Sequence, residues 1–211
     1  ELNLIQEQFE LPGISAHYVF NDGQGGGAHS GFSDIEAGLA ISDRSRMLGA
    51  STGKSFVGAL VVKLFIQGQL DIDKPVSHWL GHYEWFDRLP NYQVITLRHL
   101  LTHSSGISDH VYEEAFQQAF KQQLGKAENQ FSTEELIEYI LDKPPRFSPG
   151  ESWAYSDTGY LLIGLVLEKV TGRNYYEMIN ESFIKPLGLK DTSPATRRNI
   201  EGLAVGYIDE K

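Results

Sequence analysis

The segment from Gly49 to Phe56 reads GASTGKSF and matches three catalytic motifs at once. Ser51, with a glycine two residues to either side, fits the G-x-S-x-G nucleophile elbow of esterases. The letters GKS with a glycine upstream are similar to a phosphate-binding loop. Ser51 and Lys54 also have the S-x-x-K spacing, in which a lysine one helical turn away activates a serine nucleophile. Each motif implies a different chemistry, so the remaining residues must decide between them.

The phosphate-loop interpretation fails on spacing. The motif G-x-x-x-x-G-K-[ST] needs a glycine where this chain has Leu48, and a shorter loop does not close its backbone N–H groups around a phosphate. The esterase elbow fits the letters, but it needs a buried strand before the serine, and SDRSRML is a poor strand. It also needs a later acid and histidine, for which His99, His103 and His110 remain candidates.

The S-x-x-K interpretation needs only a helix that begins at Ser51. The segment from Ser51 to Leu70 predicts a largely buried helix, because its apolar residues form a broad stripe. These residues are Phe56, Leu60, Leu64 and Ile66. Residues three apart on a helix have Cβ atoms about 5–6 Å apart, so Lys54 reaches the Ser51 hydroxyl. A lysine acts as a base only if its pKa falls well below about 10.4.

Composition narrows the classes of partner and chemistry. The net charge is -10, from 18 Lys+Arg against 28 Asp+Glu, which argues against nucleic acid or anionic lipid as the main partner. The absence of cysteine excludes disulfides, thiolate metal sites and a cysteine nucleophile. The longest apolar run, Leu161 to Leu167, falls far short of the roughly 20 residues that span a bilayer. Because the chain begins at Glu1, we expect a processed or trimmed product.

The elements that must position these residues are mostly helices. Near the N-terminus, Ile14 to Phe20 and Asp34 to Ile41 predict two antiparallel strands, joined by the glycine-rich segment 21–31 as a loop. That loop includes the letters HSG at 29–31. Thr96 to His103 predicts a short helix, and Ser132 to Lys143 predicts a helix with a capping box formed by Ser132 and Glu135.

A second strongly apolar helix follows Ser156, with Asp157 near its N-cap and Gly172 just past its end. The segment from Asn174 to Thr192 predicts a further helix that runs into a turn. Two hairpin strands cannot cover the apolar faces of helices this hydrophobic. We therefore expect that further strands complete the sheet.

Four segments in this order resemble the serine β-lactamase and penicillin-binding-protein superfamily. They are GASTGKSF, LRHLLTHSSGIS, FSPGESWAYSDTGYLLIGLVLEKVTGRNY and IKPLGLKDT, and the likeness runs from about Phe20 to Tyr207. It is greatest to the class C-like branch of β-lactamases, D-aminopeptidases and related esterases. The resemblance implies an α+β fold, with an antiparallel sheet flanked by helices and a mostly helical subdomain. It also implies chemistry without a metal or organic cofactor.

The family's second motif, Tyr-x-Asn, falls on Tyr155-Ser156-Asp157. By this resemblance Tyr155 shares the proton transfers with Lys54, and the Ser51 backbone N–H supplies half of the oxyanion hole. Asp157 stands where the family has Asn, at a substrate-binding position. An ionised Asp only accepts hydrogen bonds and adds a negative charge, which would raise the pKa of Lys54. Because of this change, the motif does not decide between β-lactams, peptides and esters as the substrate.

The family's third motif, Lys- or His-x-Gly on a strand facing the nucleophile, has no match after Tyr155. The chain therefore resembles the N-terminal portion of the family's domain. We expect residues 1–70 to form the hairpin and nucleophile helix, 71–170 a mostly helical subdomain, and 171–211 a truncated return segment. A second chain or swapped segment is one expected source of the missing C-terminal strands.

The sequence predicts a serine hydrolase that acts through an acyl-enzyme on an amide or ester, with Ser51, Lys54 and Tyr155 as catalytic residues. The alternative is a catalytically silent or fragmentary member that binds a ligand or a partner. The i,i+4 pairs His78/His82 and His99/His103 have metal-ligand spacing, but neither has a third ligand, so we expect no metal there. The resemblance favours a periplasmic or secreted location.

Overall fold

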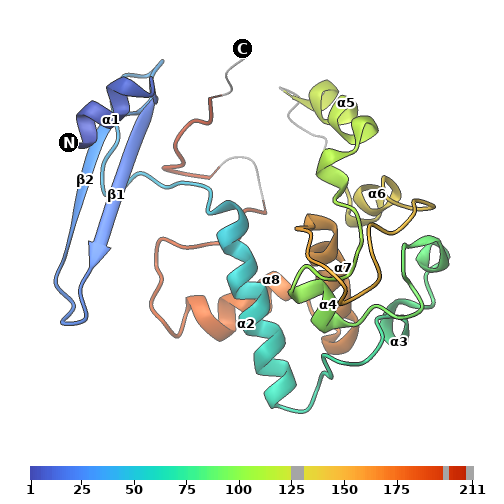
Figure 1. Ribbon diagram of the computed structural model, residues 1–211. Coiled ribbons are helices and arrows are strands. Elements are labelled where there is room, and N and C mark those ends of the chain that lie inside the picture. Colours follow the sequence, from blue (N-terminus) through green and yellow to red (C-terminus); the bar gives the residue numbers. More distant parts are fainter. Residues whose placement is uncertain (125–130, 197–199, 208–211) are drawn as a thin grey trace. The chain divides into compact units, whose positions relative to one another are not determined.

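The computed structural model describes residues 1–124, 131–196 and 200–207 (Figure 1). Its contacts divide the chain into two compact units. The first consists of Glu1–Ala50 with Ala195–Lys211, and the second of Ser51–Pro194. The division of the chain into residues 1–70, 71–170 and 171–211, which the sequence favoured, stays a prediction.

The first unit holds a small antiparallel sheet with the strand order β1-β2-β3. A short helix, α1 (Leu2–Gln8), packs on the hairpin of β1 (Gly13–Val19) and β2 (Gly25–Asp34), as Figure 1 shows. The register sets Ser15 opposite His29 and His17 opposite Gly27. The predicted return strand is reduced to β3 (Leu39–Ala40), because residues 35–38 form a turn. Helix α1 was not predicted from the sequence.

The prediction that segment 21–31 is a loop was wrong, because β2 begins at Gly25 and includes the HSG letters. Glycine has a low strand propensity, but here the absence of its side chain leaves room for side chains of the neighbouring strand. A Cβ on Gly26 would lie 2.9 Å from the Tyr18 hydroxyl, and a Cβ on Gly27 would lie 2.6 Å from the His17 ring. Side chains of β1 therefore lie over the glycines of β2. This close packing of side chain on backbone outweighs the low strand propensity of glycine.

The core of the second unit is helical. Helix α2 (Gly53–Ile66) contributes Leu60, Val61 and Leu64, and helix α7 (Asp157–Thr171) contributes a longer row of buried residues. That row comprises Thr158, Gly159, Leu162, Ile163, Gly164, Val166 and Leu167. Each fully buried leucine or isoleucine contributes about 1.5–3 kcal/mol relative to exposure, so this packing fixes both helices that carry the site residues.

Short helices surround these two. They are α3 (Ser77–Leu80), η2 (Phe86–Arg88), α4 (Leu97–Leu101), η3 (His110–Tyr112), α5 (Glu114–Gln123), α6 (Thr133–Glu138), α8 (Tyr175–Ile179) and the π-helical turn η4 (Asn180–Ile184). The capping box at the start of α6 is confirmed: Glu135 N donates to Ser132 Oγ at 3.2 Å, and Ser132 N donates to Glu135 Oε2 at 2.7 Å. Helix α5 was not predicted. Within the described ranges, none of the helices combines the length and the apolar character that crossing a bilayer requires.

Helix α2 ends earlier than the sequence predicted, at Ile66 rather than Leu70. Gly68 follows in the left-handed region at φ 70° and donates its N–H to Phe65 O, which stops the helix. Ile66 is 79% exposed, so its assignment to the buried stripe was wrong, whereas Leu64 is 2% exposed. The reason is angular: Leu60 and Leu64 are four residues apart, and Ile66 turns to the opposite side.

This difference predicts unequal costs for two truncations on one helix. Leu64→Ala should lower the free energy of unfolding by about 2–5 kcal/mol, because it leaves a cavity in the core. Ile66→Ala is the matched control and should change it by no more than about 0.5 kcal/mol. Urea unfolding followed by circular dichroism measures both. Equal losses would contradict the described packing of α2.

Candidate active site

Ser51 lies in a 3₁₀ turn, η1 (Ala50–Thr52), that leads directly into α2. The side chain is exposed, and its Oγ accepts two hydrogen bonds. The Tyr155 hydroxyl donates at 2.7 Å, and Lys54 Nζ donates at 3.3 Å. The N-terminal end of a helix favours negative charge, which suits a serine that becomes an alkoxide on attack. The three residues that the sequence predicted as catalytic therefore meet at one oxygen atom.

Lys54 reaches Ser51 because α2 carries it one turn further along the same face. Its side chain is only 17% exposed. The Nζ atom lies 4.9 Å from the centre of the Tyr155 ring and 5.4 Å from that of Tyr160. It also forms an ion pair with Asp157 Oδ1, the first residue of α7. A cation in this position is therefore balanced by two aromatic faces and one carboxylate.

The charge state of Lys54 follows from these contacts. Burial lowers the pKa of Lys54, but the hydrogen bonds and charges of Asp157 and Tyr155 raise it by more in total. The pKa of Lys54 therefore lies above its ordinary value, which agrees with the effect expected from an aspartate at position 157. In the resting site Lys54 is an ammonium ion.

Tyr155 is held by His103, a residue in the segment after α4. The two rings stack with centroids 4.4 Å apart and an interplanar angle of 29°. The backbone on either side of Tyr155 is also tied to His103: Ala154 N donates to His103 O at 2.9 Å, and Ser156 N donates to His103 Nδ1 at 3.2 Å. These contacts fix the direction of the tyrosine hydroxyl. His103 is thus a positioning residue for Tyr155.

The sequence interpretation considered His103 as a base for an esterase elbow, as a zinc ligand or as a structural residue, but it did not connect His103 with Tyr155. Burial lowers the pKa of His103, and the charge of Lys54 lowers it further. A neutral imidazole accepts the Ser156 N–H through Nδ1, so the lowered pKa agrees with the hydrogen bond. One sequence signal was available: His103 lies in the family-like segment LRHLLTHSSGIS.

Ser156 separates the two polar residues of the Tyr-Ser-Asp triplet. Its side chain is buried and caps α7 by accepting a hydrogen bond from Gly159 N at 3.2 Å. The same hydroxyl donates to Ser108 O at 3.3 Å. Asp157, which the sequence placed near the N-cap, is the first helical residue, and Ser156 is the cap itself. The hydrogen bonds of Ser156 therefore anchor the middle of the triplet, and its two neighbours, Tyr155 and Asp157, both lie next to Lys54.

The remaining histidine candidates have structural partners. His99 completes a capping box with Thr96 at the start of α4. His110 is buried and contacts the Thr158 hydroxyl through Nδ1 at 2.9 Å. Within the described residues, the hydrogen bonds of Ser51 Oγ run to Lys54 and Tyr155, so no histidine occupies the position that the elbow mechanism needs. This geometry favours S-x-x-K over the elbow.

Comparisons with known proteins agree with the family resemblance seen in the sequence. A family model described as "Beta-lactamase" matches residues 3–203. A penicillin-binding protein of Bacillus subtilis is 29% identical over 84% of this chain and 38% of its own length. Esterase EstB of Burkholderia gladioli is 29% identical over 85% of this chain and 46% of its own length. The chain thus spans less than half the length of these curated relatives.

A solved structure gives the same result for the fold. The D-stereospecific amidohydrolase from Streptomyces sp. superposes with a TM-score of 0.71 and 29% identity. The match covers 85% of this chain and 50% of that enzyme. The α+β fold expected from the sequence is therefore confirmed, with the small antiparallel sheet and the helices aligned to about half of a complete domain.

The ion pair predicts how Lys54 will titrate when its partner changes. Asp157→Asn removes the carboxylate charge that raises the pKa of Lys54, while the burial that lowers it remains. We expect the pKa of Lys54 to fall in this variant. Lysine-selective NMR titration measures it, and Lys54→Arg identifies the signal.

Asp73→Asn is the control, because Asp73 pairs with Arg98 and leaves the surroundings of Lys54 intact. A Lys54 pKa that stays unchanged in Asp157→Asn would show that the carboxylate does not control it.

Proposed function

The chain belongs to the β-lactamase family, and we propose that it is a serine hydrolase that forms an acyl-enzyme on Ser51. The observation that carries this proposal is the shared oxygen: Ser51 Oγ accepts hydrogen bonds from both Tyr155 and Lys54. Two groups able to move a proton thus contact one exposed hydroxyl at a helix N-terminus. This arrangement supports nucleophilic catalysis without a metal or an organic cofactor.

In the proposed first step, Ser51 Oγ attacks the carbonyl carbon of the substrate. The serine proton passes through the Tyr155 oxygen to neutral Lys54, and the Ser51 N–H stabilises the negative oxygen of the tetrahedral intermediate. Lys54 and Tyr155 then return the proton to the leaving amine or alcohol as the acyl-enzyme forms. Water attacks the ester in the reverse sense, releasing the acid and restoring Ser51.

Lys54 must lose a proton before it can act as this base. Because its pKa is raised, the neutral form is scarce at neutral pH, and activity should increase with pH. Asp157 therefore restrains the reaction by holding Lys54 charged. The restraint weakens when another cation or N–H group binds the Asp157 carboxylate in place of Lys54.

The substrate class follows from the same carboxylate. The Asp157 side chain is 36% exposed, so a ligand can reach it. An ionised aspartate only accepts hydrogen bonds and pairs with an ammonium group, whereas the asparagine of the family motif both donates and accepts and carries no charge. Amino-acid amides, peptides and esters with a free amino group fit this position better than β-lactams, whose own carboxylate the charge of Asp157 repels. Pairing of the substrate amine with Asp157 would also release Lys54 from its ion pair.

A second candidate is a family member that binds acyl ligands without turnover. The observation in its favour is the Lys54–Asp157 ion pair, which keeps the base protonated. Such a protein would show no steady-state hydrolysis of nitrocefin, short acyl esters or D-Ala peptides. Turnover of any one of these by the protein in its full natural length would exclude this candidate.

Labelling of Ser51 tests the leading proposal. A fluorophosphonate or fluorescent penicillin should label the full-length protein, and Ser51→Ala should abolish labelling. Lys54→Met and Tyr155→Phe should each slow it by about 10²- to 10⁴-fold, because each removes one partner in proton transfer.

His103→Ala is the control for the elbow mechanism. It should slow labelling by less than about 10-fold, since His103 positions Tyr155 but does not touch Ser51 Oγ. Loss of labelling in His103→Ala with full labelling in Lys54→Met would reverse the assignment of the base. Mass spectrometry of the labelled peptide identifies the modified serine.

Asp157→Asn gives a second kinetic test. If Asp157 restrains Lys54, the variant should hydrolyse a neutral ester faster at neutral pH, by about 10-fold for each unit by which the pKa of Lys54 falls. The rising limb of kcat/KM against pH should move to lower pH. A limb that stays in place would mean that Asp157 does not control the pKa of Lys54, and a uniformly slower enzyme would mean that Asp157 assists the reaction.

A further inference from the structure

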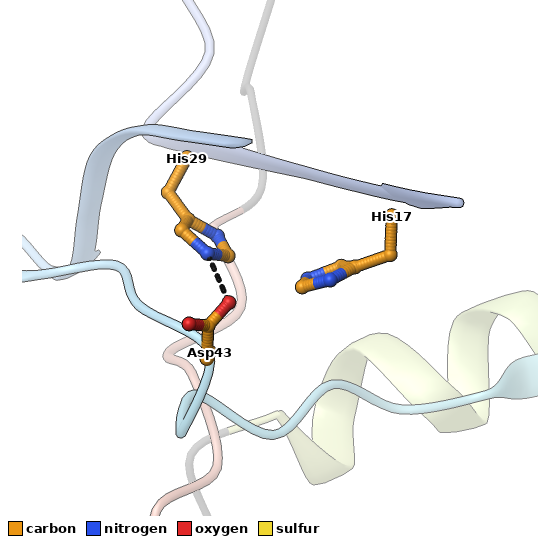
Figure 2. Close-up of side chains that lie close together, drawn as sticks. All are labelled: His17, His29 and Asp43. Atoms are coloured by element: carbon orange, nitrogen blue, oxygen red, sulfur yellow. Dashed lines mark hydrogen bonds and ion pairs between the residues drawn. The ribbon is translucent and has the colours of Figure 1, made fainter. Parts of the chain in front are cut away.

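The hairpin of the first unit brings two histidines to one face (Figure 2). His17 on β1 and His29 on β2 occupy diagonal positions, because the register pairs His17 with Gly27 and Ser15 with His29. Side chains two apart on a strand share a face, so Ser15, His17 and His29 all lie on the same side of the sheet. The two imidazole rings have centroids 5.1 Å apart.

A carboxylate from a third segment completes the group. Asp43 lies after β3, and its Oδ1 is 2.6 Å from His29 Nε2, as the dashed line in Figure 2 marks. One ligand atom from each of His17, His29 and Asp43 lies within 4.8 Å of the other two. Two imidazoles and one carboxylate are a donor set that suits divalent transition metals.

Ser15 orients both imidazoles. Its hydroxyl contacts His17 Nε2 at 2.9 Å and His29 Nδ1 at 3.1 Å. The other ring nitrogens, His17 Nδ1 and His29 Nε2, are then the ones available as ligand atoms. Metal-binding histidines typically use one ring nitrogen for the metal and hold the other by a hydrogen bond that fixes the tautomer. One serine provides that hydrogen bond to both rings.

Gly27 provides the space for this group. A Cβ at position 27 would lie 2.6 Å from His17 Nδ1 and 3.2 Å from Asp43 Oδ1. The missing side chain therefore leaves a gap next to the two ligand atoms. Any other L-residue at this position would displace the His17 ring. The glycine of β2 that contradicted the loop prediction thus has a local function.

We propose that His17, His29 and Asp43 bind a divalent transition-metal ion, with Zn²⁺ as the preferred metal. Zinc binds histidine nitrogen at about 2.0–2.1 Å and carboxylate oxygen at about 2.0–2.2 Å. Asp43 is 78% exposed and His17 is also exposed, so both side chains can rotate to close the remaining distance. Three protein ligands leave a fourth position for water. The ion would connect β1, β2 and the segment after β3.

Zn²⁺ titration of the full chain by calorimetry tests this proposal. We expect one Zn²⁺ per chain and a higher thermal midpoint with the metal, because an ion that binds only the folded state stabilises it. Co²⁺ should give the visible absorption of a nitrogen- and oxygen-bound ion. His29→Ala and Asp43→Ala should each weaken Zn²⁺ binding by at least about 10-fold.

Two further variants keep all three ligands. Ser15→Ala removes the hydrogen bonds that orient the rings and should weaken binding by about 10- to 100-fold. Gly27→Ala should weaken it by displacing His17. Circular dichroism establishes that each variant is folded. If His29→Ala or Asp43→Ala unfolds, His17→Gln replaces it, because this change removes one ligand at similar volume and should also weaken Zn²⁺ binding by at least about 10-fold.

The matched control is the His78→Ala/His82→Ala double variant, which removes another pair of histidines from the surface of the second unit. It should bind Zn²⁺ as the unmodified protein does. Binding that survives in both His29→Ala and Asp43→Ala, or that is lost in the control, would show that the three residues form only a hydrogen-bonded surface network. Absence of any Zn²⁺-dependent heat or thermal shift would have the same meaning.

Discussion

The ion pair between Lys54 and Asp157 is the interaction on which the site depends. Both residues lie in the first turn of a helix, where the backbone carries partial positive charge. Asp157 suits that position and Lys54 does not, so the carboxylate compensates the lysine as well as the end of its own helix. A largely buried ammonium without such a partner would lose its proton or disrupt the fold. The pair therefore stabilises the site in its resting state and determines the charge with which catalysis begins.

This pair joins parts of the chain that are 103 residues apart, and its geometry depends on helix packing. The buried rows of α2 and α7 belong to one core cluster, which holds the first turns of the two helices in place. Tyr155 precedes α7 and is fixed by His103 from a third segment. The short distances at Ser51 Oγ are thus the result of three separate constraints: an apolar core, a helix cap and an aromatic stack.

Part of this site was predictable from local patterns. The spacing of Ser51 and Lys54 on a helix needs no tertiary information, and the capping signals around Ser132 and Gly172 act within a few residues. Tyr155 was predicted from a family resemblance, because a lone tyrosine before a helix carries no chemical signal. The stacking of His103 could not be predicted, since it requires knowledge of which segments meet.

The errors have a similar physical origin. The glycines of β2 have loop composition, and only the cross-strand register shows that they make room for His17 and Tyr18. The same register brings His17 and His29 together from positions whose sequence spacing matches no metal-binding pattern. Ile66 was assigned to the buried stripe by its hydrophobicity, although its angle on the helix is opposite to that of Leu64.

The cap at Ser156 has a consequence for how this triplet can change in evolution. The residue is extended, with φ -148° and ψ 114°, so its two neighbours point to one side while its own hydroxyl points into the protein. Replacing a neighbour alters the chemistry but keeps this alternation. Adding or deleting one residue would exchange inward and outward positions, burying the tyrosine or the carboxylate and exposing the cap. The triplet therefore tolerates substitutions at its first and third positions, but it does not tolerate an insertion or a deletion.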